Sequence, residues 1–140
     1  NSKIIATTID ENGINIVKEI IDKENLNNQI EVKLEDVTKK SNYPDNYFDY
    51  IYARLVLHYL NNKDLENALE ELNRILKPNG TIICANADFD SITFNGKDKE
   101  LIRNVIHSYA ITKQPWMDDL DSWMGRRTYS IFNNTNRRYN

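Results

Sequence analysis

The sequence is poor in the residues that build several common kinds of site. Its single cysteine, Cys84, excludes an internal disulfide and fits a reducing compartment. Its four glycines are isolated, so neither a G-x-G nucleotide loop nor a P-loop occurs. No apolar run approaches the roughly 20 residues of a membrane-spanning helix, and no signal peptide opens the chain. We therefore expect a cytoplasmic protein with no membrane partner.

Length and charge are those of one ordinary globular domain. The 140 residues carry a net charge of −3, with 28% charged and 40% hydrophobic residues. Because the basic residues are scattered, we expect no nucleic-acid partner. The sequence shows no metal-ligand cluster and no Ser-His-Asp order, so a metal site, hydrolysis and phosphotransfer have no support.

Apolar periodicity predicts a strand, a helix and a second strand in the first part of the chain. Residues 3–9 are rich in β-branched side chains and end abruptly at a polar segment, residues 10–13. Residues 29–34 alternate as a strand and close at Glu35-Asp36. The helix between these strands carries its apolar face at Ile14, Val17, Ile20 and Ile21.

The stretch that follows predicts a second strand–helix–strand unit. Residues 43–46 are turn residues, and residues 48–53 form an aromatic-rich strand. Asn61-Asn62 offers a helix cap, and Pro78-Asn79-Gly80 is expected to stop the helix before a strand over residues 81–85. The stripe on that helix is Leu65, Ala68, Leu69, Leu72, Ile75 and Leu76. Strands alternating with helices predict a three-layer α/β fold with a mostly parallel sheet.

Three runs in this stretch also resemble a known family. Tyr43–Asp49, Tyr52–Leu60 and Leu69–Gly80 are similar, in the same order, to class I S-adenosylmethionine-dependent methyltransferases of the small-molecule branch. The resemblance implies a Rossmann-like fold, S-adenosylmethionine as cofactor and a small-molecule substrate. It also implies in-line methyl transfer, which depends chiefly on holding the acceptor in near-attack geometry.

The resemblance implies cofactor-binding residues at the ends of the first two strands. Asp10, followed by Glu11, falls where the family has an acid that binds the ribose, and carboxylates at comparable strand ends do this in dinucleotide folds. Asp36 falls where an acid accepts from the adenine amino group, and Val37 would present its backbone N–H to the ring. Alternatively, Asp10 is a helix N-cap and Asp36 a turn former.

The end of the strand at residues 48–53 supplies further candidates. Ala53 and Arg54 are assigned to the cofactor, since Arg54 can hydrogen-bond a cofactor or substrate carboxylate. His58 is the histidine near the strand ends, so it is the candidate general base if the acceptor must lose a proton. The alternatives are an exposed strand-end cation for Arg54 and a boundary imidazole for His58.

Residues beyond the strand at 81–85 are expected to face the substrate. Asp88 and Asp90 are candidates for orienting a substrate donor, with a solvated turn as the alternative. Residues 97–132 form a predicted helical cap, in which Trp116 belongs to an apolar roof and Arg126 to a Gly-Arg segment that opens a later helix. A helix over residues 98–110 is expected to turn Leu101, Ile102, Val105, Ile106 and Tyr109 inward.

Parts of the family pattern find no match here. The Gly-rich loop for the methionine end, and the middle strand before it, would precede Asn1, and two later strands would follow Asn140. We therefore expect a partial domain over residues 1–140, incomplete at both ends. It is either a fragment of a longer polypeptide or a non-catalytic descendant that associates through strand edges, for instance as a homodimer. A dehydrogenase half with Asp10 on a ribose is the third alternative.

Overall fold

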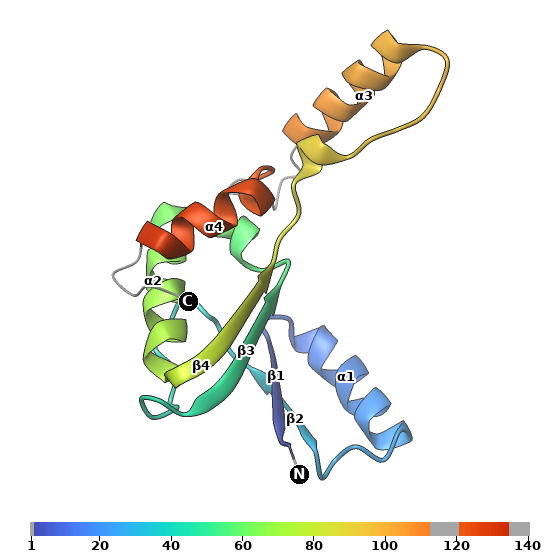
Figure 1. Cartoon of the computed structure of the whole chain (residues 1–140). Helices are drawn as coiled ribbons and strands as arrows, with labels where there is room; N and C mark the ends of the chain where they lie inside the picture. Colours follow the sequence, from blue (N-terminus) through green and yellow to red (C-terminus); the bar gives the residue numbers. More distant parts are fainter. Residues whose placement is uncertain (1, 113–120, 135–140) are drawn as a thin grey trace. The chain divides into compact units, whose positions relative to one another are not determined.

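The computed structural model describes residues 2–112 and 121–134 (Figure 1). The chain divides into two compact units, Asn1–Tyr43 and Pro44–Asn140, and each is described by itself. Within the described ranges, none of the helices combines the length and apolar character that crossing a bilayer requires.

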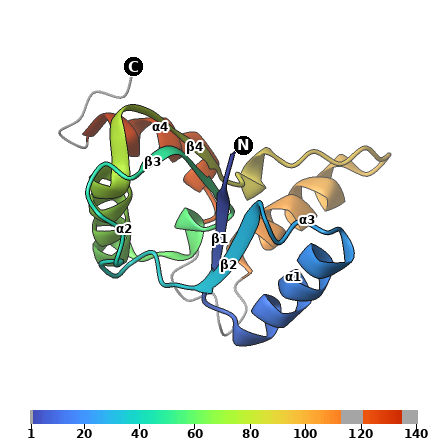
Figure 2. The same cartoon turned by 90° about the horizontal axis from the view of Figure 1, so that it is seen from below.

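The first unit is a strand–helix–strand unit built as predicted. Strand β1 (Ile4–Thr8), helix α1 (Glu11–Lys23) and strand β2 (Ile30–Leu34) follow one another, and α1 packs beside the strand pair (Figures 1 and 2). The strands run parallel, with Ile4 opposite Ile30 and Thr8 opposite Leu34. A parallel pair needs a crossover connection, and α1 provides it.

The packed face of α1 is narrower than its apolar stripe predicts. Ile21 is buried and Ile14 and Val17 are half-buried, but Ile20 is 53% exposed. With only two strands to cover, the helix buries one edge of the stripe, so the predicted inward position of Ile20 is not observed.

The second unit contains a parallel strand pair and the helices that follow it. Its elements are β3 (Phe48–Arg54), the 3₁₀ turn η1 (Leu57–Tyr59), α2 (Asn62–Ile75), β4 (Leu76–Ala85), the 3₁₀ turn η2 (Phe89–Ser91), α3 (Lys99–Ile111) and α4 (Met124–Asn134). Ala53 lies opposite Cys84 and Arg54 opposite Ala85, so β3 and β4 end level with each other. Both units thus confirm the α/β class with parallel strands.

Helix α2 is capped and buried as its sequence predicts. The Asn61 side chain accepts a hydrogen bond from the backbone N–H of Asp64 at 2.9 Å. The buried apolar residues of α2 are Leu65, Ala68, Leu69, Leu72 and Ile75. Leu65 and Leu69 form a core cluster with Leu57 and Met124, which joins α2 to α4, and both views show these helices beside each other (Figures 1 and 2).

Pro78-Asn79-Gly80 does not separate the helix from the strand as predicted. Helix α2 already ends at Ile75, and β4 begins at Leu76, so the tripeptide is inside the strand. Phe48 pairs with Leu76 but Tyr50 pairs with Thr81, so the tripeptide is a bulge. Asn79 has a φ of 66°, and a Cβ on Gly80 would lie 3.0 Å from the Asp49 carbonyl oxygen. Glycine permits that close approach.

Helix α3 is less buried than its stripe predicts. The prediction that Leu101, Val105 and Tyr109 turn inward is wrong, because they are 59%, 46% and 56% exposed. The helix packs mainly through its carboxyl end, where Ala110 is buried and its carbonyl accepts a 2.5 Å hydrogen bond from the Ser122 hydroxyl. Tyr109 still meets the Phe89 ring edge-on, at 5.5 Å between centroids.

Across the described ranges, strands pair as β1–β2 and as β3–β4, in two two-stranded sheets. The middle strand that the family resemblance implies is not among these described strands. Each unit nevertheless presents the feature on which a site depends, a carboxyl edge shared by two parallel strands.

Candidate functional site

In the first unit, the predicted cofactor residues share one edge of the sheet. The backbone N–H of Glu35 donates to the Thr8 carbonyl at 2.9 Å, so β1 and β2 end together. Asp10 and Glu11 follow β1, and Asp36 and Val37 follow β2. We call these four residues the carboxylate edge.

Asp10 caps helix α1 and keeps one oxygen open. Its Oδ1 accepts from the backbone N–H of Asn12 at 3.0 Å, which confirms the alternative interpretation as an N-cap. Its Oδ2 has no partner among residues 2–112 and 121–134, and a Cβ on Gly13 would stand 3.0 Å from it. The carboxylate is exposed. Capping therefore leaves a free acceptor at the carboxylate edge.

Asp36 forms a turn with its neighbours. Its Oδ1 accepts from the hydroxyl of Thr38 at 2.7 Å and from the backbone N–H of Thr38 at 3.0 Å, while the Lys39 ammonium lies 3.1 Å from Oδ2. The Thr38 hydroxyl, its N–H and the lysine hold the pKa of the Asp36 carboxyl below its ordinary value, so it stays ionised. The turn former is thus confirmed. The backbone N–H of Val37 has no acceptor among the residues that the structure describes.

In the second unit, the carboxyl ends of β3 and β4 are held level by the residue after β3. Leu55 has a φ of 54° and donates its N–H to the Ala85 carbonyl at 2.8 Å. A leucine in that region is strained, which marks a turn that the surrounding contacts hold in place. Ala53 is buried, whereas Arg54 is exposed and lacks an ion pair with any described carboxylate. Arg54 is therefore an open cation at this edge.

His58 lies in the core rather than at the helix boundary proposed as the alternative. The residue is 1% exposed, and neither ring nitrogen has a hydrogen-bond partner among the described residues. Its ring lies 4.2 Å from the Tyr59 ring and 6.2 Å from the Phe89 ring, centroid to centroid. Burial lowers the pKa of His58, and the Asp121 carboxylate opposes this only in part. The imidazole is therefore neutral at pH 7.

The structure brings two predicted substrate residues together. Arg126, which lies 38 residues from Asp88, donates from Nε to Oδ2 at 2.5 Å and from Nη2 to Oδ1 at 2.8 Å. The Gly125 N–H donates to the Ala87 carbonyl at 2.9 Å, and a Cβ on Gly125 would stand 2.8 Å from that of Asp88. This bidentate pair fixes the start of α4 against the segment after β4.

Two other predicted substrate residues have no described side-chain position. Asp90 belongs to η2, but its side chain is outside what the structure describes, and Trp116 lies outside the described residues. Trp123, which lies in the predicted cap segment, stands in the turn before α4 and is 39% exposed. Met124, the first residue of α4, is buried in the core.

Asn86 is a polar residue of this edge that the sequence pattern did not single out. Its Nδ2 donates to the Thr128 hydroxyl at 3.0 Å, while its buried Oδ1 has no partner among the described residues. Asn86 directly follows β4, and this position at a strand end is the signal from which it could have been predicted as a site residue. With the Asp88–Arg126 pair, Asn86 makes the segment after β4 a polar surface facing α4.

Comparison with known proteins adds a family to this geometry. The model of a family described as a methyltransferase domain matches residues 1–84. The chain is 35% identical over 81 residues to the demethylmenaquinone methyltransferase of Bacteroides fragilis, covering 58% of this chain and 32% of that protein. It is 32% identical over 78 residues to the ubiquinone/menaquinone biosynthesis C-methyltransferase UbiE of Shewanella sp. (strain ANA-3), covering 56% and 28%. The chain thus spans about a third of these relatives' length.

Solved structures agree with that match. A SAM dependent methyltransferase from Aquifex aeolicus superposes with a TM-score of 0.56 at 26% identity, covering 70% of this chain and 50% of that one. The YcgJ protein from Bacillus subtilis superposes with a TM-score of 0.65 and covers 95% and 52%, but its 16% identity shows the fold alone.

Proposed function

Because this chain belongs to the methyltransferase-domain family, we propose that it is part of an S-adenosylmethionine-dependent methyltransferase that acts on a small molecule. The observation that carries this proposal is the carboxylate edge together with the match over residues 1–84. The match also favours methyl transfer over the dehydrogenase alternative. The protein is proposed to work in the cytoplasm without a nucleic-acid partner.

The residues of the carboxylate edge fit the nucleoside part of S-adenosylmethionine. The open Oδ2 of Asp10 suits a ribose hydroxyl, and Glu11 adds a second carboxylate beside it. The unengaged N–H of Val37 suits an adenine ring nitrogen. Asp36, ionised and half-buried, has acceptor capacity left for the adenine amino group. The sequence given contains no G-x-G loop to hold the methionine end.

The second unit supplies groups that suit the reacting end. When bound, the cofactor supplies a methyl group activated by its sulfonium. Arg54 is the open cation for a carboxylate, and the backbone at Ala53 forms the strand end beside it. His58 is proposed as the proton acceptor, since its neutral ring nitrogens are not engaged by described residues. Its burial means that the acceptor reaches it only if the segment around η1 opens.

The remaining substrate residues are proposed to shape the acceptor site. Asp88 and Asp90 follow β4, and Asp88 is paired with Arg126 on α4. Trp116 is proposed to complete the cap over residues 97–132. The name of the Bacteroides fragilis relative makes demethylmenaquinone the first acceptor to test. Small-molecule specificity depends on such caps rather than on the shared core.

The test of the cofactor site is calorimetric titration with S-adenosylhomocysteine, comparing the parent chain with Asp10→Asn. Asparagine caps helices as well as aspartate, so the variant keeps α1 intact while it removes the charged acceptor. We expect about tenfold to hundredfold weaker binding, the scale of about 1–3 kcal/mol for a lost charged hydrogen bond.

The matched control is Asp22→Asn, which changes an exposed carboxylate at the other end of α1. It should leave the affinity unchanged. Equal affinity of Asp10→Asn and the parent would remove Asp10 from the site, and no binding by any folded variant would contradict the cofactor proposal for this chain.

A second candidate function is association through strand edges. Each described sheet has two strands, and sheets of this size are marginal unless further strands or helices support them. Their outer strands offer unpaired backbone groups to another chain or to a second copy. Sedimentation equilibrium tests this candidate: a homodimer without affinity for S-adenosylhomocysteine would favour it, and a monomer at all concentrations would oppose self-association.

A further inference from the structure

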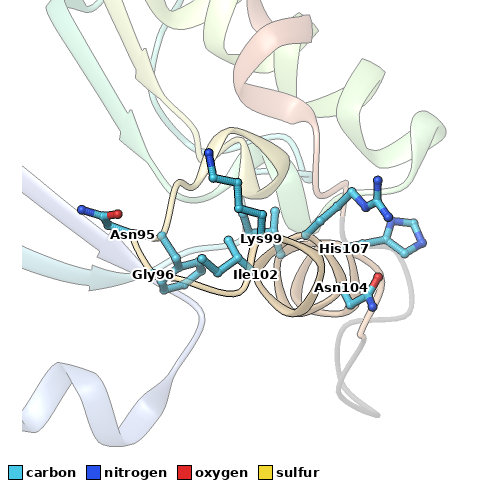
Figure 3. Close-up of a pocket in the computed structure, with 9 residues that line it drawn as sticks. Asn95, Gly96, Lys99, Ile102, Asn104 and His107 are labelled. Atoms are coloured by element: carbon cyan, nitrogen blue, oxygen red, sulfur yellow. The ribbon is translucent and has the colours of Figure 1, made fainter.

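An open pocket lies between helix α3 and the loop that precedes it, and none of the individual residues assigned to the cofactor or the methyl acceptor is in its lining. Its volume is about 730 Å³, within the range of small-molecule sites. Figure 3 shows Asn95 and Gly96 on the loop, with Lys99, Ile102, Asn104 and His107 on the helix. Phe94, Arg103 and Ile106 complete the lining, and we call this site the α3 pocket.

The α3 pocket is basic. Lys99, Arg103 and His107 are four residues apart in turn, so they follow one face of the helix. The lining contains no carboxylate. Among the residues that the structure describes, neither Lys99 nor Arg103 forms an ion pair. The pocket therefore holds two cationic side chains that form no ion pair with a described carboxylate.

The rest of the lining is apolar or neutral. Ile102 and Ile106 are half-buried beside the basic face, and Phe94 is 52% exposed on the loop. Gly96 allows the loop to come close, since a Cβ there would stand 2.9 Å from the Ile102 Cδ1 (Figure 3). Asn95 and Asn104 add amide groups that can donate or accept hydrogen bonds.

We propose that the α3 pocket binds a small free molecule with one anionic group and an apolar body. Lys99 and Arg103 would hold the anion through charge-assisted hydrogen bonds, and Phe94, Ile102 and Ile106 would contact the body. None of the individual residues assigned to the cofactor or the methyl acceptor lines this pocket. Its helical part, residues 99–107, lies within the segment proposed as the cap, residues 97–132. The site thus goes beyond the proposed methyl transfer and can be tested without it.

The probe is the fluorescent anion anilinonaphthalene sulfonate, which pairs a sulfonate with an aromatic body. N-phenylnaphthylamine, the same body without the sulfonate, is the matched ligand control. We expect saturable binding of the anion, and weaker binding of the neutral analogue by about tenfold or more, since a charged hydrogen bond contributes about that factor. The double variant Lys99→Gln/Arg103→Gln should lose a similar factor for the anion and keep its affinity for the neutral analogue.

The variant control is Lys18→Gln/Lys23→Gln, which removes the same net charge from exposed positions on α1. It should bind the anion as the parent does, and circular dichroism should show that all variants are folded. Equal binding of the two ligands, or equal loss in both double variants, would overturn the proposal. The proposal would also be overturned if the protein sedimented with phosphatidylglycerol vesicles but did not bind the dispersed anion. The ligand would then be a lipid surface.

Discussion

Arg74 donates two hydrogen bonds to the carboxylate of Glu71, from Nε to Oε2 at 2.8 Å and from Nη2 to Oε1 at 2.6 Å. Glu71 is buried, with 8% of its surface exposed, and the third donor of Arg74 reaches the Asp45 carboxylate at 2.7 Å. The Arg74 carbonyl also accepts from the Asn46 N–H at 2.9 Å. The last turn of α2 is thereby tied to the turn that begins β3, so part of the family-like run Leu69–Gly80 serves the fold.

Replacing Arg74 alone should therefore destabilise the chain more than replacing both partners. Arg74→Met removes two charged hydrogen bonds from the buried Glu71 carboxylate, whereas Glu71→Met/Arg74→Met removes the buried charge as well. We expect a clear loss in the free energy of unfolding for the single variant and a partial recovery in the double variant, measured by urea denaturation. Equal losses in both would show that the pair contributes only its packing.

Leu72→Ala should lower the free energy of unfolding by about 2–5 kcal/mol, because it opens a cavity under α2. Leu72 is 6% exposed. The control is Leu101→Ala on α3, where the side chain is 59% exposed and the expected change is within about 0.5 kcal/mol. A near-neutral Leu72→Ala would mean that α2 is not docked on its strands.

Gly125→Ala should displace the start of α4. The added Cβ would meet the Asp88 backbone nitrogen at 2.9 Å and the Ala87 carbonyl carbon at 3.0 Å, and neither atom can move without moving the chain. We expect a loss of about 1–3 kcal/mol, the usual cost of overpacking, read from thermal unfolding. Gly96→Ala is the comparison, since its Cβ would meet only the flexible end of Ile102. If Gly125→Ala lowered the stability no more than Gly96→Ala, the close approach of α4 to the segment after β4 would be contradicted.

His58 should make the chain sensitive to mild acid. Its pKa is lowered in the folded state from 6.5, so the unfolded chain binds the proton more readily. The imidazole's contribution to the free energy of unfolding is complete above about pH 6.5 and is lost as the pH falls toward the folded pKa.

This loss is measured by urea denaturation at three pH values about one unit apart, roughly 7.5, 6.5 and 5.5. His58→Gln should flatten the profile. His107→Gln, which changes the exposed histidine of α3, should keep the parent slope. If the stability of His58→Gln depended on pH as steeply as that of the parent chain, the acid sensitivity would belong to other groups.

Local signals predicted most of the elements and several of their details. The apolar stripe of α2 and its Asn61 cap were predictable because both depend on neighbouring residues along one helix. The boundary at Pro78-Asn79-Gly80 was misplaced because a bulge has the same turn residues as a loop, and only pairing with β3 distinguishes the two. Asp10 and Asp36 were predicted at their strand ends with both a capping or turn role and a binding role, and the structure confirms the first.

The order of strands and helices, the parallel pairing implied by that order, and the family could all be predicted from the sequence, because periodicity, caps and motif runs are properties of short segments. The long-range contacts could not be predicted and are seen only in the tertiary structure. It pairs Asp88 with Arg126, places both nitrogens of His58 in the core, and leaves Leu101 and Val105 on the surface of α3. These outcomes depend on which surfaces meet, and a helical stripe shows that a face can be buried without showing what covers it.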